Sequence, residues 1–301
     1  MIESMQTDAH FPLVATDWDE HENCDQVIWP SLESMDMRIV GGEWIRHDLH
    51  ESGKLPLATL AIRRSGTRKL VVALHGTLNR ATTRLPRFER ARSLSTLDAN
   101  VLILADTTLT VEKSLPTAWF IGTPEDAITD RYAQLIHSVI DQWGIEHTVI
   151  AGASSGGFAA LALAPRVPEA LAVAMSPQTR IRNRPTSRPF QQFVYNRFGG
   201  WDGIEKRPEL RPRVDLTELY HQLPAGNAWY IQNTGDVEHV EQHANPFLTE
   251  HEDRVKYVQE YHCEGHNPPT PRRFLEWVQH GLDLPLSDPR ESVTSVPTQI
   301  G

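Results

Sequence analysis

Cysteine is scarce in this sequence, and long apolar runs are missing from it. Only two cysteines, Cys24 and Cys263, occur among 301 residues, and they lie far apart, so no disulfide framework is indicated. No apolar run reaches the length of a membrane span. Residues 1–25 are acidic and lack the basic and apolar regions of a signal peptide. We therefore expect a cytoplasmic protein that has no membrane span.

Positive charge is also in deficit, which argues against nucleic acid as a partner. The net charge is −10, and the sequence contains no basic-aromatic recognition motif. Internal repeats are missing too. The length and the 40% hydrophobic content suffice for one α/β domain with a buried core. We expect that domain at 36–284, after a polar N-terminal extension at 1–35 and before a disordered Pro/Ser/Thr-rich tail at 285–301.

Apolar and alternating runs predict strands and helices in alternation. The expected strands include 37–44, 58–64, 100–106, 170–176, 227–232 and 254–261, and the expected helices include 123–144, capped by Thr123, and 271–281. This order predicts an α/β fold.

The most informative stretch is 149–161, where an apolar run enters Gly-Ala-Ser-Ser-Gly and leaves through an Ala-rich run. A G-x-S-x-G pentapeptide between a strand and a helix is typical of a nucleophile elbow. The turn is tight, so its flanking residues must lack side chains, and it exposes the central hydroxyl. Ser154 is therefore the candidate nucleophile. The alternative is a glycine-rich turn that only joins the strand to the helix.

Two further candidates follow Ser154 in the chain order Ser, Asp, His. Asp236 and His266 each come just after a predicted strand. We predict that His266 takes the Ser154 proton and returns it to the leaving group, while Asp236 orients the imidazole. Asp236 could instead only form a turn, and His266 could be a loop histidine without a role. Glu238 is the alternative acid.

An oxyanion hole is expected beside this nucleophile. One donor is the backbone N–H of Ser155, and the second is the N–H of Thr77 or of Leu78, in the loop after the apolar strand that starts at Lys69. His75, in the same loop, is either a structural hydrogen-bonding residue or a substrate contact.

These motifs resemble the α/β-hydrolase superfamily. The matching motifs are Leu-His-Gly-Thr at 74–77, Gly-Ala-Ser-Ser-Gly at 152–156, Thr-Gly-Asp at 234–236 and Gly-His at 265–266. The resemblance covers roughly 55–283. It implies a mainly parallel, doubly wound sheet, with a cap inserted after the strand that follows the elbow helix. It also implies a serine hydrolase of the carboxylesterase type that works through an acyl-enzyme and needs no cofactor.

A narrower resemblance concerns the run that contains Asp236. The sequence Tyr-Ile-Gln-Asn-Thr-Gly-Asp at 230–236, with His239, His243 and the later Gly-His pair, is similar to accessory-secretion and capsule-biosynthesis hydrolase-like proteins. This resemblance implies the alternative functions, an O-acyltransferase or a non-catalytic accessory protein of surface-glycan biosynthesis. The acyl group, the acceptor and the oligomeric state stay open.

The expected cap, about 178–225, is basic although the whole chain is acidic. Residues 178–224 hold nine basic and five acidic side chains. A second basic stretch follows the oxyanion loop and includes Arg80. Arg80, Arg180 and Arg182 are therefore candidates to bind an anionic small-molecule or glycan ester. Alternatively, these arginines are solvated or paired with acids. The cap's aromatic residues line a sugar or acyl pocket or form the cap's own core, and they are Phe190, Phe193, Tyr195, Phe198 and Trp201.

The segment 238–243 contains two histidines that could ligate a metal ion. His239 and His243 are four residues apart, but the order H-x-E-x-H displaces the glutamate from its position in zinc peptidases. We expect no metal. Each histidine is expected either at the exposed start of a helix or in support of Asp236.

Overall fold

The chain forms a mixed α/β structure around one open sheet. The computed structural model describes residues 15–39, 43–183, 187–223 and 226–284. The sheet has ten strands in the order β1-β2-β3-β4-β6-β5-β7-β8-β9-β10. The strands are β1 Ala15–Asp19, β2 Cys24–Trp29, β3 Ile45–Leu49, β4 Leu57–Ile62, β5 Lys69–Leu74, β6 Asn100–Leu104, β7 His147–Ala153, β8 Ala170–Met175, β9 Asn227–Asn233 and β10 Lys256–Glu260.

Strands β5 to β10 are all parallel to one another. Strand β4 is antiparallel to both β3 and β6, and β1 is antiparallel to β2. Parallel strands end at the same edge of a sheet, so the loops that follow β5, β7, β9 and β10 meet there.

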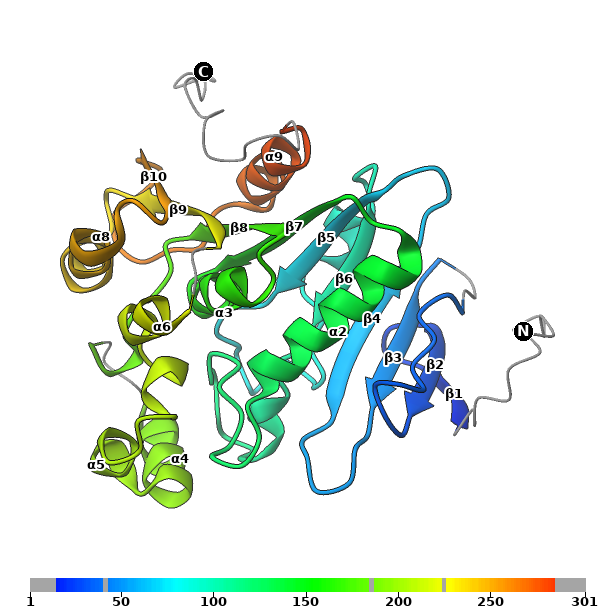
Figure 1. Cartoon of the computed structure of the whole chain (residues 1–301), viewed down its shortest axis with the longest axis horizontal. Helices are drawn as coiled ribbons and strands as arrows, with labels where there is room; N and C mark the ends of the chain where they lie inside the picture. The colour runs from blue at the N-terminus through cyan, green and yellow to red at the C-terminus, as the bar shows by residue number, and fades with distance from the viewer. Residues whose placement is uncertain (1–14, 40–42, 184–186, 224–225, 285–301) are drawn as a thin grey trace.

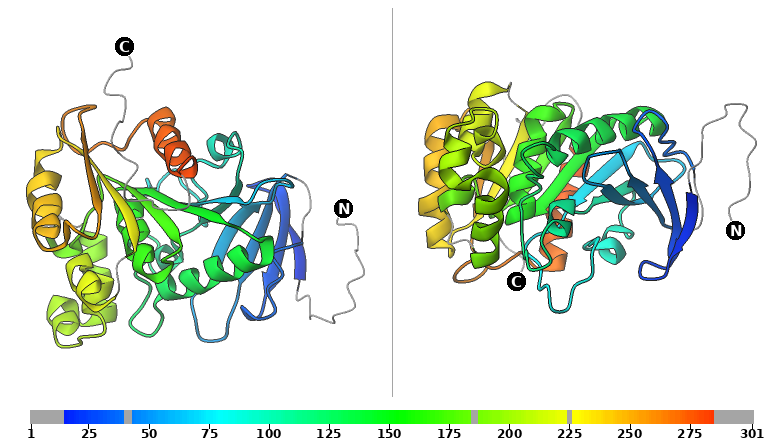
Figure 2. Two further views of the ribbon diagram at one scale, coloured as in Figure 1. Left: turned by 45° about the horizontal axis from the view of Figure 1, so that its top comes forward. Right: turned by 90° about the horizontal axis from the view of Figure 1, so that it is seen from below.

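Helices cover both faces of the sheet. They are α1 Ala91–Leu94, α2 Ile128–Trp143, α3 Ser155–Leu163, α4 Arg188–Phe198, α5 Gly200–Glu205, α6 Leu216–Gln222, α7 Val237–His239, α8 Asn245–His251 and α9 Pro271–Leu282. Short helical turns lie at η1 Thr107–Thr110, η2 Ala164–Arg166, η3 Ile181–Asn183, η4 Arg211–Arg213 and η5 Val240–Ala244. Helices α2 and α3 pack on one face and α9 on the other (Figures 1 and 2).

The core is divided by the sheet into two layers. Val72 packs with the α2 and α3 side chains, whereas its neighbour Val71 packs with the α9 side chains. Successive side chains of a strand point to opposite faces, so a strand buried on both faces is apolar throughout. This explains why the central strands are visible in the sequence as short apolar runs.

The N-terminal part of the chain differs from the expected extension. Ala15–Asp19 and Cys24–Trp29 lie within 1–35, yet they form β1 and β2 of the sheet, and Trp29 is fully buried. The boundary at residue 35 therefore does not separate an extension from the fold. Residues 1–14 and the expected tail at 285–301 lie outside the described residues.

The segment expected as a cap is helical. It carries α4, α5 and α6, which lie to one side of the sheet (Figure 1). Phe190, Phe193 and Phe198 are buried in the main core, and Phe190 packs against Trp119 with ring centroids 4.8 Å apart. These three rings serve packing rather than an open pocket. No helix within the described ranges is long and apolar enough to span a membrane.

Candidate active site

The turn between β7 and α3 holds Ser154 in a strained conformation. Its backbone has φ 55° and ψ −120°, which a non-glycine residue adopts only at a cost. The two glycines of the motif make the turn possible. A Cβ on Gly152 would lie 2.2 Å from the carbonyl oxygen of Gly156, and a Cβ on Gly156 would lie 2.6 Å from that of Leu74. The G-x-S-x-G pattern is therefore a steric requirement of this turn.

His266 lies within hydrogen-bond distance of both Ser154 and Asp236. The Nε2 of His266 is 2.8 Å from the Oγ of Ser154, and its Nδ1 is 2.6 Å from Oδ2 of Asp236. Asp236 is buried, whereas Glu238, the alternative acid, is exposed. The geometry therefore favours Asp236 as the partner of His266.

Asn233, the last residue of β9, joins the Asp236 loop to the His266 loop. Its Nδ2 donates to the carbonyl oxygens of Cys263 and Gly265 at 2.8 and 3.3 Å. Its Oδ1 accepts from the N–H groups of Gly235 and His262, each at 3.2 Å. Sequence reasoning treated Asn233 only as a residue that ends a strand. Nothing in the local sequence indicates its bonds to a loop 30 residues away.

A second histidine contacts the same acid. The Nδ1 of His239 is 3.2 Å from Oδ1 of Asp236, and its ring stacks on that of His266 with centroids 3.8 Å apart. Burial raises the pKa of Asp236, but the hydrogen bonds from His239 and His266 outweigh it and hold that pKa well below its usual range. His239 and His243 are both buried, so the expectation of an exposed helix start is wrong. The contact between His239 and Asp236 agrees with the alternative expectation that His239 supports Asp236.

Gln178 connects this second histidine to the nucleophile. Its Nε2 lies 3.1 Å from Ser154 Oγ and 2.7 Å from Nε2 of His239. Its Oε1 accepts from the indole N–H of Trp119 at 3.0 Å. Gln178 is fully buried, so these contacts fix its amide. Sequence reasoning did not select it, and the only available signal was its position just after strand β8.

The loop after β5 faces the elbow. The Leu78 N–H already donates to the carbonyl oxygen of Pro116 at 2.7 Å, which removes it as an oxyanion donor. Ser155 is the first residue of α3, and the N–H groups of a first helical turn have no acceptor inside the helix. The N–H of Ser155 and that of Thr77 therefore stay as the candidate donors.

His75 lies in the interior rather than in the cavity. Its Nε2 accepts from the N–H of Asp106 at 3.0 Å, and its Nδ1 lies 2.8 Å from the carbonyl oxygen of Gly76. Burial lowers the pKa of His75, which keeps the ring neutral and able to accept. These contacts fit the structural alternative for His75 and not a substrate contact.

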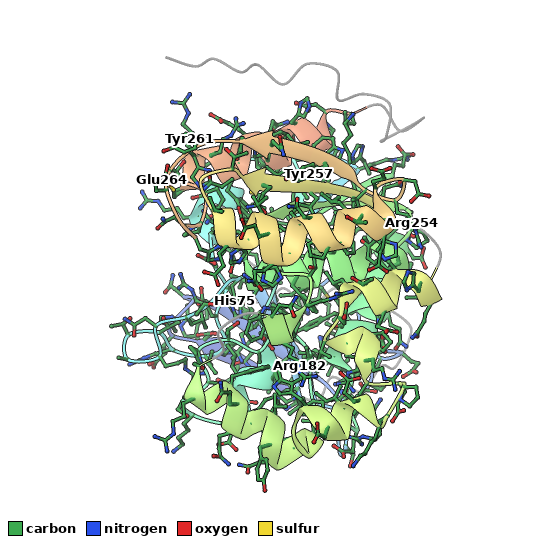
Figure 3. The ribbon with its side chains drawn as sticks, turned by 90° about the vertical axis from the view of Figure 1, so that its left-hand side faces the viewer. His75, Arg182, Arg254, Tyr257, Tyr261 and Glu264 are labelled. Carbon is green, nitrogen blue, oxygen red and sulfur yellow. The ribbon has the colours of Figure 1, made fainter. Side chains whose placement is uncertain are left out.

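The three arginines expected to bind substrate are engaged elsewhere. Arg80 donates to the carbonyl oxygens of Leu109 and Leu115 at 3.3 and 3.0 Å. Arg180 pairs with acids on α8 and before α6, and Arg182 pairs with an acid on α5 at 3.4 Å. Figure 3 shows Arg182 beside α4 and α5, away from Tyr261 near the His266 loop. Arg180 and Arg182 thus match the alternative of arginines paired with acids, whereas Arg80 bonds to backbone carbonyl oxygens instead.

A cavity of about 160 Å³ opens beside the Ser154 hydroxyl. Its lining residues are Leu74, Gly76, Thr77, Glu89, Arg90, Ala153, Ser154, His266, Pro268 and Phe274. None of the described residues from 179 to 223 belongs to this lining, so the helical segment does not form its wall.

Two clusters within the described ranges could hold a metal ion. Asp236, His239 and His266 offer ligand atoms within 4.8 Å of one another, and so does a second group on α6 and α8 formed by His221, Glu250 and His251. In the first cluster each oxygen of Asp236 faces one histidine nitrogen at hydrogen-bond distance. Glu241, the glutamate of the H-x-E-x-H motif, belongs to neither cluster and is exposed.

Comparison with known proteins gives a likeness of fold and none of sequence. No protein-family model matches this sequence, and no curated protein sequence matches it. Among solved structures, the capsule O-acetyltransferase of Neisseria meningitidis serogroup A has a TM-score of 0.54 at 14% identity, over 77% of this chain and 92% of that one. Acetyl xylan esterase 1 from Thermoanaerobacterium sp. JW/SL YS485 has a TM-score of 0.53 at 15% identity, over 84% and 87%.

A hydrolase of another substrate class shares the fold as well. The S-formylglutathione hydrolase from Agrobacterium tumefaciens has a TM-score of 0.50 at 14% identity, over 79% of this chain and 94% of that one. Such identities establish fold and not activity. In its fold, this chain resembles this esterase, this hydrolase and the capsule O-acetyltransferase.

Proposed function

We propose that this protein is a serine acyl hydrolase of the carboxylesterase type that works through an acyl-enzyme on Ser154. One observation carries the proposal. A continuous hydrogen-bonded chain runs from the Ser154 hydroxyl through His266 to a buried carboxylate, and it begins at a strained elbow. This arrangement is what an activated serine requires.

His266 acts as the general base and then as the general acid. Its Nε2 takes the Ser154 proton while Oγ attacks the ester carbonyl, and the tetrahedral intermediate forms. His266 then gives that proton to the leaving alcohol as the ester C–O bond breaks. Asp236 stays ionised throughout, because its pKa is held low, and it stabilises the imidazolium.

The N–H groups of Ser155 and Thr77 stabilise the negative charge on the carbonyl oxygen. Both belong to backbone that is already fixed, the first by helix α3 and the second by the Leu78–Pro116 hydrogen bond next to it. Donors that need no rearrangement lower the barrier most.

Water is the favoured acceptor for the acyl group. The His266 side chain keeps 23% of its surface exposed and lines the cavity, which supports water as the attacking hydroxyl. Water would add to the acyl carbonyl while His266 takes its proton. His266 would then return that proton to the Ser154 Oγ as the bond between Oγ and the acyl carbon breaks, which releases the acid and restores the Ser154 hydroxyl. Transfer to a glycan hydroxyl is the second candidate, favoured by the fold shared with a capsule O-acetyltransferase.

The first test is covalent labelling with a fluorophosphonate, measured by intact mass. We expect stoichiometric labelling of the wild type and none of Ser154→Ala. Circular dichroism of the variant should match the wild type, because the change removes only a hydroxyl from a half-buried side chain. Equal labelling of both proteins would overturn the assignment of the nucleophile. Labelling of neither would favour a non-catalytic accessory protein.

The second test separates the two candidate acids. Asp236→Asn leaves the His266 ring without an anionic partner and should lower kcat for a short aryl ester by about 10⁴-fold. Glu238→Gln, a change of the same size on an exposed side chain, should stay within about twofold, since surface changes are usually small. The reverse order of the two effects would reassign the acid to Glu238.

A further inference from the structure

Arg90 is the one arginine among the residues that line the cavity at Ser154. It stands at the start of helix α1 with φ 66°, and its guanidinium carbon lies 4.4 Å from the ring centroid of Phe274. Phe274 belongs to helix α9 and is itself buried. The aromatic face limits where the guanidinium can lie, because a planar cation stacks on a ring.

Within the described part of the chain, no carboxylate lies within 4.0 Å of the Arg90 guanidinium, and no hydrogen bond from it is found. Its neighbour Glu89 also lines the cavity, but one Glu89 oxygen is 3.4 Å from the N–H of Gly76 in the oxyanion loop. Arg90 therefore differs from Arg80 and Arg180, whose guanidinium groups have protein partners.

Arg90 is also partly removed from water. Burial lowers the pKa of its guanidinium, although an arginine stays charged at any physiological pH. The nearby Glu89 carboxylate acts on it electrostatically without forming an ion pair, and a desolvated cation with no paired anion raises the free energy of the folded protein. An anion that enters the cavity would supply the missing partner.

We propose that Arg90 binds a carboxylate or phosphate group of the substrate, so that the preferred substrates are anionic esters of small size. The inference rests on the proposed function of Ser154 and adds the substrate class to it. A guanidinium presents two parallel N–H donors that fit both anions in a bidentate manner. The anion would lie on the wall formed by Arg90 and Phe274, while the ester carbonyl points at the Ser155 and Thr77 N–H groups.

The test compares each anionic ester with its neutral methyl ester. One pair, 4-acetoxybenzoate and methyl 4-acetoxybenzoate, carries the charge on the leaving group. The other pair, mono(4-nitrophenyl) adipate and its methyl ester, carries it on the acyl group. We expect the wild type to prefer the anionic member of at least one pair by about 10-fold or more in kcat/KM. The pair that shows the preference tells on which side of the ester the anion binds.

Variants then assign the preference to one side chain. Arg90→Gln should abolish it and leave kcat/KM for the neutral esters within about threefold, since a lost charge-assisted bond affects only the anion. Arg92→Gln is the matched control, because Arg92 lies on the same helix but is exposed and outside the lining. An equal loss for neutral and anionic esters, or an unchanged preference, would overturn the proposal.

A binding experiment separates this inference from the proposed function. Calorimetry with benzoate and with inorganic phosphate is carried out on Ser154→Ala and on the double variant that also carries Arg90→Gln. Binding that the second change removes supports the anion site even if no ester is hydrolysed. Equal binding, or none to either protein, overturns the anion site and leaves the role of Ser154 untouched.

Discussion

Asn233 determines where His266 lies relative to Asp236. Its side chain bonds the backbone of both loops, and Gly235 next to it allows their close contact, since a Cβ there would lie 2.1 Å from the Cys263 carbonyl oxygen. His266 itself is half-buried and stacks on His239, but most of the neighbouring residues of its loop are exposed. The position of the proposed general base therefore depends on hydrogen bonds made by Asn233, which does not line the cavity.

Replacing this side chain should impair catalysis more than binding. Asn233→Ala removes the bonds between the loops, and we expect kcat to fall by about 10²-fold through misplacement of the imidazole, with KM nearly unchanged. Steady-state kinetics with a short aryl ester measures both. Asn227→Ala, at the opposite end of the same strand, removes only a bond to the Pro168 carbonyl and should leave kcat within about twofold. If Asn227→Ala lowered kcat by the same factor, the effect would come from general damage to β9 and not from the bonds that Asn233 makes between the loops.

The sequence predicts some of the residues at the candidate site but not others. Ser154, Asp236 and His266 each follow a strand, in an order that can be seen in the sequence. In the structure His266 lies 2.8 Å from the Ser154 hydroxyl oxygen and 2.6 Å from an Asp236 carboxylate oxygen. Gln178 was not a candidate, and Arg90 was only one member of the basic stretch that follows the oxyanion loop. Their contacts involve residues between 24 and 184 positions away, which no local pattern encodes.

The elbow is an element whose shape is set by contacts between backbones. Gly152→Ala would drive a Cβ to 2.2 Å from a carbonyl oxygen in the first turn of α3, where neither backbone can move without opening β7. We expect a loss of about 2 kcal/mol or more in the free energy of unfolding, by analogy with overpacking in cores. Urea denaturation measures it. Gly281→Ala, whose nearest neighbours are side-chain methyl groups at 3.2 Å or farther, should be close to neutral, and a larger loss for it would contradict the argument.

Elements were predicted well where burial alone determines them. Strands β6, β8 and β9 agree with the expected ranges within a few residues, because their side chains are buried on both faces. The strand expected at 37–44 is wrong, since 37–39 and 43–44 lie outside any strand and β3 begins at Ile45. The start of the expected helix at Thr123 is also wrong, since α2 begins at Ile128. The carboxylate of Asp126 accepts from the Leu55 N–H at 2.7 Å and pairs with Arg131 at 2.9 Å, and these tertiary bonds hold 123–126 in a turn.

Stability of the whole molecule should fall as the pH falls below neutrality. His47 is buried in β3, and its Nδ1 accepts from the indole N–H of Trp29 at 3.2 Å. Burial lowers the pKa of His47 from 6.5 to about 4. Between these two values the unfolded chain binds a proton that the folded protein excludes, so stability present at pH 7 is lost as the pH drops toward 4.

The contribution of His47 to this pH dependence can be measured with a variant. His47→Gln keeps an acceptor for Trp29 and removes the titration. We expect the difference in unfolding free energy between pH 7 and pH 5 to shrink by about 2 kcal/mol in this variant. Parallel pH curves for His47→Gln and the wild type would contradict the assigned pKa.

By itself the sequence determined the α/β class, the central strands, the elbow and the order of Ser154, Asp236 and His266. Apolar period, glycine sterics and chain order are local properties, so they can be read along the chain. The tertiary structure decided the remainder: that β1 and β2 join the sheet, that Arg80, Arg180 and Arg182 have protein partners, and that Arg90 faces the cavity. Whether a charge meets a partner depends on which distant segments fold against it, and that is settled only when the chain is packed.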